Sequence, residues 1–299
     1  MPRPPARLAN CYVPVSLREE GKQQSSLIPV TPANVTTLRG DRKYHELRQL
    51  CLEMGVLANR AIGSSMVELG HTKVLCQVSM NVSHPNTIPE RGILDCKVQF
   101  APHIGIDAST QRAQAVMPLD SMLSTGKLHS ETMSRESSLS AQLHSSLVSV
   151  LKLQDFPKCA LEVHATILQD DGSVLTTCIT AASLALADAR VEMLDMVASC
   201  TVAVFEADPG DVKDQSSMDV ENEASREPIF LADPTEAEQI RASTIICLAM
   251  TPNLKEVTLW SQSGRLDVSH SSQAIEICRS GCRTMHKLMR EVWISKLQQ

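Results

Sequence analysis

The residues best suited to chemistry lie at a turn before an apolar run, in the stretch QDDGSVLTTCITAASLALADA at 169–189. A helix N-terminus offers free backbone N–H groups and the positive end of the helix dipole, so it can hold an anion such as phosphate. Tight phosphate binding usually needs a cation as well, and arginine supplies both charge and geometry. Here Ser173, Val174 and Leu175 stand where that cation would be, and the two preceding aspartates would repel an anion. The residues alone favour a structural turn over a phosphate site.

Other motifs that carry chemistry are absent from the sequence. It contains no G-x-x-x-x-G-K-[ST], G-x-S-x-G, H-E-x-x-H or G-x-G-x-x-G. The histidines are scattered, and His164 alternates within a predicted strand, on its polar face. Cys278 and Cys282 could share a helix face, but zinc would need two more ligands at a suitable spacing, and none is nearby. We therefore expect neither a metal nor a cofactor.

The composition excludes several classes of protein. The chain has 299 residues, of which 43% are hydrophobic and 21% charged, as in ordinary soluble domains. Aromatic residues at 3% argue against a nucleic-acid reader built on base stacking, and a net charge of −6 gives no overall basic footprint. No apolar run approaches the roughly 20 residues of a membrane span, and the N-terminus has no apolar signal core. The cysteines sit singly in apolar stretches, such as Cys76, Cys178 and Cys247, which indicates buried reduced thiols.

The elements that must position the turn follow from hydrophobic periodicity. Residues 65–80 predict a hairpin with its turn at Gly70-His71, and 161–167 predict a half-buried strand before the Asp171-Gly172 turn. The run TTCITAASLALADA predicts a helix buried in the core, and strands are predicted at 197–205, 245–250 and 257–260. Two amphipathic helices are also predicted. The first is indicated by the four-residue spacing of Leu139, Leu143, Leu147 and Leu151. The second covers 272–296, and its inner stripe consists of Ala274, Ile277, Cys278, Gly281, Met285, Leu288 and Val292. Strands and helices mix without a strict βαβ repeat, so the predicted class is α+β.

Two segments lack such patterns. Residues 1–39 hold six of the fifteen prolines and predict an N-terminal extension, partly disordered or draped over a neighbour. Residues 206–228 carry eight acidic and two basic residues, which predicts a solvated insertion, with a regulatory or partner-binding acidic segment as the alternative. One domain is therefore predicted over 40–299, interrupted by the acidic insertion at 206–228.

Four stretches in the right order give the sequence a family resemblance. DGSVLTTCITAASLALADARVEMLDMVASCTVAVF at 171–205 resembles the core of the RNase PH family. The segments at 40–80, 134–151 and 230–250 are similar to the family's opening hairpin, its first long helix and the segment after its variable loop. The resemblance covers about 40–293 without the acidic insertion, and it looks most like the ring subunits of the eukaryotic RNA exosome. It implies an RNase PH-like fold of mixed sheets packed with a buried helix and a long C-terminal helix.

The resemblance also implies an activity that this chain has lost. Active family members degrade RNA from its 3′ end with phosphate as the nucleophile, which they hold with a Gly-Gly-Thr-Arg-Thr-like turn. That turn corresponds to residues 172–176, where Leu175 stands at the arginine position. The catalytic aspartate position falls at Ser243 and Thr244, and neither can act as a carboxylate. Asp233 matches an earlier acidic position but cannot make a site alone. The resemblance thus implies a catalytically degenerate chain with no catalytic residues.

The resemblance implies partners as well. They are other RNase PH-type exosome subunits in a six-membered ring, exosome cap proteins and single-stranded RNA, in rRNA processing and RNA decay in the nucleus, nucleolus and cytoplasm. Arg91, Lys97 and Arg112 lie where family members face the ring's channel, but three dispersed cations favour plain surface charge, so RNA-binding residues stay unassigned. The alternatives are an active phosphate-dependent 3′-to-5′ exoribonuclease and a stand-alone enzyme with an unrecognised site.

Overall fold

The computed structural model describes residues 39, 42–57, 61–82, 91–102, 122–205 and 228–298, with side chains omitted at 82 and 122–131. The predicted N-terminal extension therefore lies outside the described residues except for Arg39, and the acidic insertion lies outside them except for Pro228. Arg112 lies outside them too. The described part of the chain contains no helix long and apolar enough to cross a membrane.

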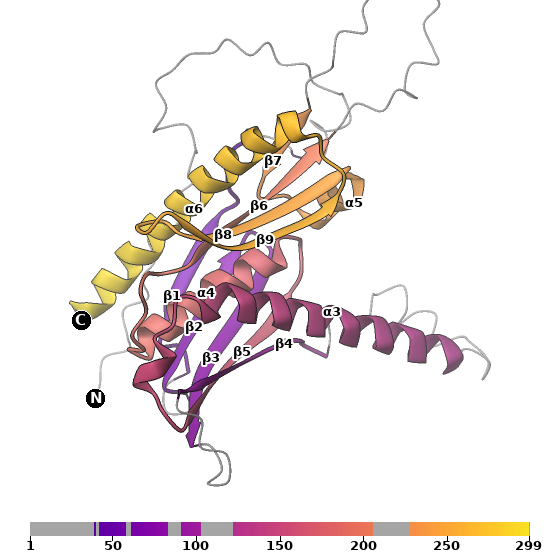
Figure 1. Cartoon of the computed structure of the whole chain (residues 1–299). Helices are drawn as coiled ribbons and strands as arrows, with labels where there is room; N and C mark the ends of the chain where they lie inside the picture. The colour runs from indigo at the N-terminus through magenta and orange to yellow at the C-terminus, as the bar shows by residue number, and fades with distance from the viewer. Residues whose placement is uncertain are drawn as a thin grey trace, which may run out of the picture.

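The described residues form two sheets and four α-helices (Figure 1). The first sheet has the order β1 (Leu50–Met54), β2 (Gly63–Leu69), β3 (Thr72–Val82), β5 (Cys159–Gln169) and β4 (Ile93–Phe100). The second has the order β7 (Ile229–Ala232), β6 (Ala198–Phe205), β8 (Thr244–Thr251) and β9 (Glu256–Gly264). The helices are α3 (Met122–Val148), α4 (Val174–Asp188), α5 (Glu236–Arg241) and α6 (Val268–Leu297), with a short 3₁₀ turn η2 (Leu153–Asp155). All strand pairs are antiparallel except β4 with β5, which are parallel.

Helix α4 lies between the two sheets and is buried along nearly its whole length. Its sequence is small and apolar on every side, so it can pack against one sheet on each face. Hydroxyl groups from both sheets also bond to its backbone: the Ser65 Oγ donates to the Ala181 carbonyl at 2.6 Å, and the Ser199 Oγ donates to the Thr176 carbonyl at 3.0 Å. The helix is therefore fixed to both layers.

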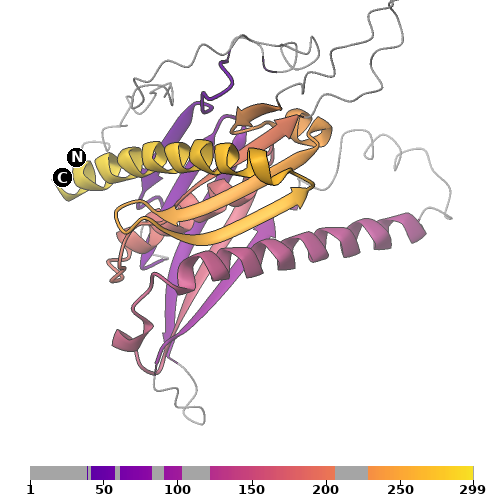
Figure 2. The same ribbon diagram turned by 45° about the horizontal axis from the view of Figure 1, so that its top comes forward.

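Strand β6 is enclosed between two helices. Its Thr201 faces α4, where the Thr201 and Thr176 hydroxyls share a hydrogen bond of 2.6 Å, whereas Cys200 faces α6 at Gly281. This double burial explains why ASCTVAVF reads as a nearly continuous apolar run rather than an alternating one. Figure 2 shows α6 lying across the second sheet while α3 runs beside β4 at the edge of the first.

Most of the predicted elements are confirmed. The hairpin turns at Gly70-His71 between β2 and β3, and the 161–167 strand lies in β5 with its predicted apolar face buried. The buried helix, the three later strands and the α+β class are also confirmed. Of the ten cysteines, Cys76, Cys178 and Cys247 are buried free thiols as predicted. Burial raises the pKa of the Cys178 thiol to about 12, with a smaller contribution from Asp170, so it stays protonated and unreactive at neutral pH.

One detail of the predicted helices is wrong, and the inner stripe of another is wider than predicted. Leu139, Leu143 and Leu147 lie on α3, but Leu151 follows the end of that helix and forms an isolated bridge with Met193. A tight turn ends the helix, because the Val150 N–H donates to the Leu147 carbonyl at 3.1 Å. On α6 the buried set also contains Cys282, His286 and Met289, whereas Ile277, Leu288 and Val292 are only half-buried. The predicted face of α6 therefore packs on the core, since Ala274, Cys278, Gly281 and Met285 are buried and the three half-buried residues also contact the core.

The close approach of α6 to β6 gives a first prediction. A Cβ at Gly281 would press on the Cys200 Sγ and lie 3.0 Å from its Cβ. Gly281→Ala should therefore lower the free energy of unfolding by about 1–3 kcal/mol, even though alanine is the better helix former. Thermal denaturation should show this as a drop of about 2–4 °C per kcal/mol.

Two control variants test the cause of that drop. Gln273→Ala on the exposed face of α6 should leave the melting temperature nearly unchanged. Cys200→Ala added to Gly281→Ala should restore part of the lost stability, because it removes the sulfur that the new methyl group meets. A Gly281→Ala protein as stable as the parent would show that α6 does not lie this close to β6.

Candidate functional site

The turn before α4 has an unusual backbone. Gly172 has φ +83° and Ser173 has φ +53°, both in the left-handed region. Ser173 occupies the N-cap position, but its hydroxyl does not cap the helix; the Oγ donates instead to the Pro234 carbonyl at 3.1 Å. The Ser173 carbonyl accepts hydrogen bonds from the Thr177 N–H and hydroxyl. The serine thus ties the start of α4 to the segment between β7 and α5.

That segment covers the helix start. The Glu236 N–H donates to the Asp171 carbonyl at 3.1 Å, and a Cβ at Gly172 would lie 2.6–2.8 Å from the backbone of residues 234–236. Only glycine fits there, on grounds of both space and φ. Ser173, Val174 and Thr176 are exposed by only 2–5%. The helix end that would have to receive an anion is therefore covered by protein.

Arg48 fills the interior of this region. Its guanidinium donates to Asp233 through Nε at 3.0 Å and Nη2 at 2.8 Å, a bidentate pair whose side chains are 5% and 3% exposed. The same group donates to the carbonyls of Asp171 at 2.6 Å and Gly172 at 3.1 Å, and the Arg48 backbone N–H donates to Asp233 Oδ2 at 2.9 Å. Arg48 thus joins three parts of the chain: the segment before β1, the turn before α4 and the residue after β7. We call this contact the Arg48–Asp233 lock.

The electrostatics of the lock favour its charged form. Burial acts to raise the pKa of the Asp233 carboxyl, but the charge of Arg48 and its hydrogen bonds outweigh burial and hold that pKa below its usual value. Asp233 is therefore ionised at neutral pH, and its two oxygens are committed to Arg48. A carboxylate held in this way is not available as a general acid or as a metal ligand.

A second buried charge cluster stands beside the lock. The Glu238 carboxylate is fully buried and pairs with Arg39 at 3.4 Å and Arg42 at 3.5 Å. Glu238 also closes the capping box of α5 with Thr235. Arg39 donates to the carbonyls of Tyr44, Glu46 and Ala232, and although burial, aided by Arg42, lowers the pKa of its guanidinium to about 10, it stays charged. Arg39 is therefore bonded directly to the folded domain.

The residues at the predicted family positions are used structurally. The Leu175 side chain is half-buried and packs on the hydrophobic core. The Ser243 hydroxyl donates to the Val204 carbonyl at 2.7 Å, and the buried Thr244 hydroxyl donates to the Arg265 carbonyl. With Asp233 bound to Arg48, these positions offer no free cation for phosphate and no free carboxylate. Within the described residues, no cluster of His, Cys, Asp or Glu could hold a metal ion either.

The remaining predicted residues lie elsewhere. Arg91 is exposed, and Lys97 pairs with Asp95 at 3.2 Å on the surface of β4, which suits plain surface charge. His164 lies half-exposed on β5, 3.5 Å from Glu162, away from the core. Arg39, Arg42 and Arg48 were not among the residues predicted from the sequence. Their signal was a run of basic residues directly before the first strand, matched by the acid-containing DPTEAE segment at 233–238.

Comparison with known proteins agrees with this architecture. The model of the 3′ exoribonuclease family, domain 1 (RNase PH), matches residues 46–192. The chain is 28% identical over 289 residues to the exosome complex component MTR3 of Homo sapiens, with 92% of each chain covered. It is 28% identical over 253 residues to the exosome complex component Rrp41 of Cenarchaeum symbiosum, with 84% of this chain and 87% of the relative covered. Three stretches, FPKCALEVHATILQDDGS, LALADARVEM and FLADPTEAEQ, resemble in particular the ring subunit called the mRNA transport regulator.

Solved structures share the fold. Rice Rrp46 superposes with a TM-score of 0.61 at 17% identity, covering 85% of this chain and 98% of that one. The archaeal exosome core gives a TM-score of 0.58 at 18% identity, covering 83% and 89%. The predicted RNase PH-like fold is therefore confirmed.

The Arg48–Asp233 lock yields a prediction with a defined pH dependence. Removing one partner leaves a buried unpaired charge, so Arg48→Met and Asp233→Asn should each lower the free energy of unfolding by about 3–5 kcal/mol at pH 7. The folded pKa of Asp233 is depressed, so the lock stabilises the protein above the unfolded pKa of about 3.9 and its contribution is lost as the pH falls through the folded value. Chemical denaturation between pH 7 and pH 2 should show the deficit of both variants shrinking below about pH 4.

The matched control is a surface pair. Lys97→Met breaks the exposed contact with Asp95 and should change stability by about 1 kcal/mol or less. If Arg48→Met proved as mild as Lys97→Met, or if its deficit did not change with pH, the lock would not be a buried charged pair.

Proposed function

We propose that the protein is a non-catalytic subunit of an exosome core ring, because residues 46–192 match the model of the RNase PH family. In this role it holds the ring of RNase PH-type subunits together and guides single-stranded RNA towards a nuclease elsewhere. It thereby supports 3′-to-5′ RNA processing, including rRNA processing, and RNA decay. The similarity to the human exosome component MTR3 over 92% of both chains supports this proposal.

The covered N-terminus of α4 is the observation that most strongly supports a lack of catalytic activity. A phosphorolytic site must admit phosphate and neutralise it, and must present a free carboxylate. Here residues 234–236 cover the helix start, an apolar leucine stands at position 175, and Asp233 is committed to Arg48. The alternative of an active exoribonuclease would need all three features to change together.

An exposed strand edge supports the ring. Among the described residues, β9 ends the second sheet with Val257 and Trp260 exposed. An edge strand with exposed apolar side chains invites pairing with another chain. The β4 edge of the first sheet is already occupied, because α3 side chains accept hydrogen bonds from the Val98 and Phe100 N–H groups. A ring built by heterologous contacts uses two different faces of each subunit, and we propose the β9 edge as one of them. Cap proteins of the exosome are the further partners that we propose, and the proposed locations are nucleus, nucleolus and cytoplasm.

Catalysis provides the first test. The purified protein, given an oligoribonucleotide and inorganic phosphate, should release no nucleoside diphosphate above a protein-free blank. Leu175→Arg combined with Thr244→Asp should not restore release, because the helix start stays covered and cooperating groups act as a unit. The measurement is chromatographic detection of nucleoside diphosphates, with a phosphorolytic RNase PH family member as the positive control. Phosphate-dependent release by the parent protein would refute the non-catalytic assignment.

Assembly provides the second test. A ring subunit whose interfaces are uncovered should be poorly soluble when expressed alone, because permanent interfaces commonly bury about 2,000 Å² or more and aggregate when open. Co-expression with an RNase PH-type partner should raise the soluble yield severalfold and give a defined hetero-oligomer. The measurement is soluble yield followed by light scattering. A stable monomer at micromolar concentration that ignores the partner would contradict the ring role and support a stand-alone protein.

A further inference from the structure

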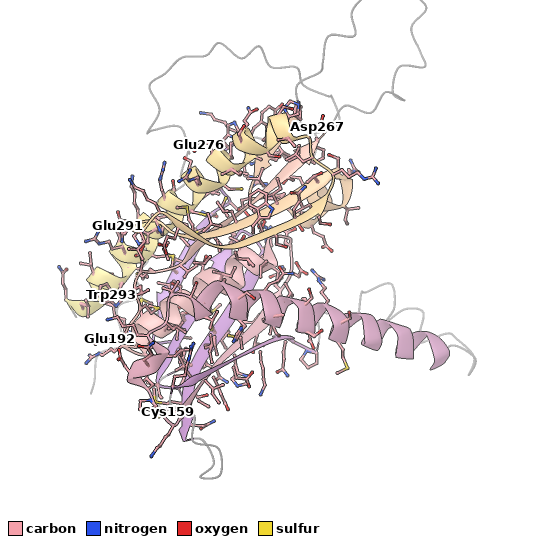
Figure 3. The ribbon with its side chains drawn as sticks, viewed as in Figure 1. Cys159, Glu192, Asp267, Glu276, Glu291 and Trp293 are labelled. Carbon is pink, nitrogen blue, oxygen red and sulfur yellow. The ribbon has the colours of Figure 1, made fainter. Side chains whose placement is uncertain are left out.

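A cavity of about 720 Å³ opens at the other end of α4, about 20 Å from the Arg48–Asp233 lock by the length of the helix. It lies where the C-terminal turn of α4, the segment after it and the last turns of α6 come together. Figure 3 shows Trp293 of α6 and Glu192 of that segment on the same side of the molecule. This cavity is separate from the degenerate phosphate position, and nothing in the proposed function uses it.

The floor of the cavity is apolar and adaptable. Its lining contains Met54, Met193, Met196 and Trp293, all of which are half-buried. Methionine side chains are flexible and polarisable, and they are overused on surfaces that bind peptides of varied sequence. Leucine side chains border the floor: Leu297 in the lining is 60% exposed and the neighbouring Leu194 is 55% exposed. Apolar side chains of a partner would therefore find contacts both inside the cavity and at its edge.

The acidic groups of the cavity are already paired. Asp188 binds Lys296 of α6, and Glu192 binds Lys152 at 3.1 Å. The Asp195 carboxylate accepts hydrogen bonds from the Met196 and Asn253 backbone N–H groups and from the Asn253 side chain, and it lies 3.5 Å from His286. Asp188 and Asp195 therefore have little capacity left to bind a cationic partner, whereas Glu192, whose side chain is 66% exposed, keeps a negative charge at the surface.

The two arginines of the lining differ from the acids. Arg190 and Arg290 are exposed, and the structure records no ion pair for either one among the residues that it describes. Arg190 also stands in the left-handed region, with φ +56°, directly after the C-cap of α4. Glycine is the usual residue there, since a side chain in that conformation is strained. A strained arginine with its charge free, at the rim of an apolar cavity, suits recognition of an anion.

We propose that this cavity is a docking site for a short segment of another protein that carries apolar side chains flanked by carboxylates. The apolar side chains enter the methionine-lined floor, and the carboxylates bind Arg190 and Arg290 at the rim. A peptide can place one or two carboxylates opposite the arginines and avoid the paired acids. A nucleic-acid backbone is a poorer occupant, because its continuous phosphates would also pass close to Asp188, Glu192 and Asp195.

The test is a selection of random 12-residue peptides against the purified protein, with the ring partners that keep it soluble. Peptides that also bind Arg190→Glu/Arg290→Glu are removed by counter-selection. We expect the remaining sequences to be enriched in Leu, Met or Phe together with Asp or Glu. A fluorescent synthetic copy of the most enriched peptide should lose at least tenfold in affinity on the double variant, as measured by fluorescence anisotropy. Its affinity should also fall with added salt.

A matched control separates the site from general charge. Arg241→Glu/Arg265→Glu makes the same change of charge at exposed arginines outside the cavity and should alter the affinity less than twofold. Trp293→Ala should weaken binding without changing the preference for carboxylates. Enrichment of cationic peptides, no enrichment above the counter-selection, or equal losses in the two charge-reversal variants would each overturn the proposal. Competition by single-stranded RNA with the selected peptide would show a nucleic-acid site instead and would also overturn it.

Discussion

The bidentate contact between the Arg48 guanidinium and the Asp233 carboxylate joins segments that are 185 residues apart and belong to both sheets. Two buried charges are stable together only when nearly all their hydrogen-bonding groups are used, and here the guanidinium also reaches the carbonyls before α4. The position of the α4 N-terminus, the course of residues 234–236 over it and the start of β1 all depend on this contact. Replacing a buried ion pair by apolar residues of similar volume is often neutral, whereas removing one partner is strongly destabilising.

The same contact decides what the fold can do. This fold places a helix N-terminus between two sheets, which is a natural anion site. In this chain that end is covered by protein, and the charges near it neutralise each other rather than a ligand. The opposite end of α4 is open, with apolar walls and two arginines at its rim. The N-terminus of α4 thus belongs to the domain interior, whereas its C-terminus borders an open cavity.

The sequence predicted what short-range patterns encode. Alternation in 161–167 and the turn at Gly70-His71 are local signals, and the run at 176–189 has so few polar side chains that only the interior could accommodate it. The family resemblance pointed to Leu175 and to Ser243 and Thr244. The partnership of Arg48 with Asp233 could not be read from the sequence, because no periodicity links residues so far apart. The inner stripe of α6 was predicted from its periodicity, but the burial of His286 and Met289 beside that stripe depends on how the helix packs against the second sheet.

The covered N-terminus of α4 should be unable to receive an anion. Diffraction from crystals of the assembled complex soaked in tungstate, which resembles phosphate and scatters strongly, measures this. We expect no tungstate at residues 172–176 of this subunit and an intact Arg48–Asp233 contact, and we expect a phosphorolytic RNase PH family member soaked in the same way to bind the ion at the corresponding turn. Tungstate bound at residues 172–176, with residues 234–236 displaced or Arg48 turned towards the ion, would contradict it.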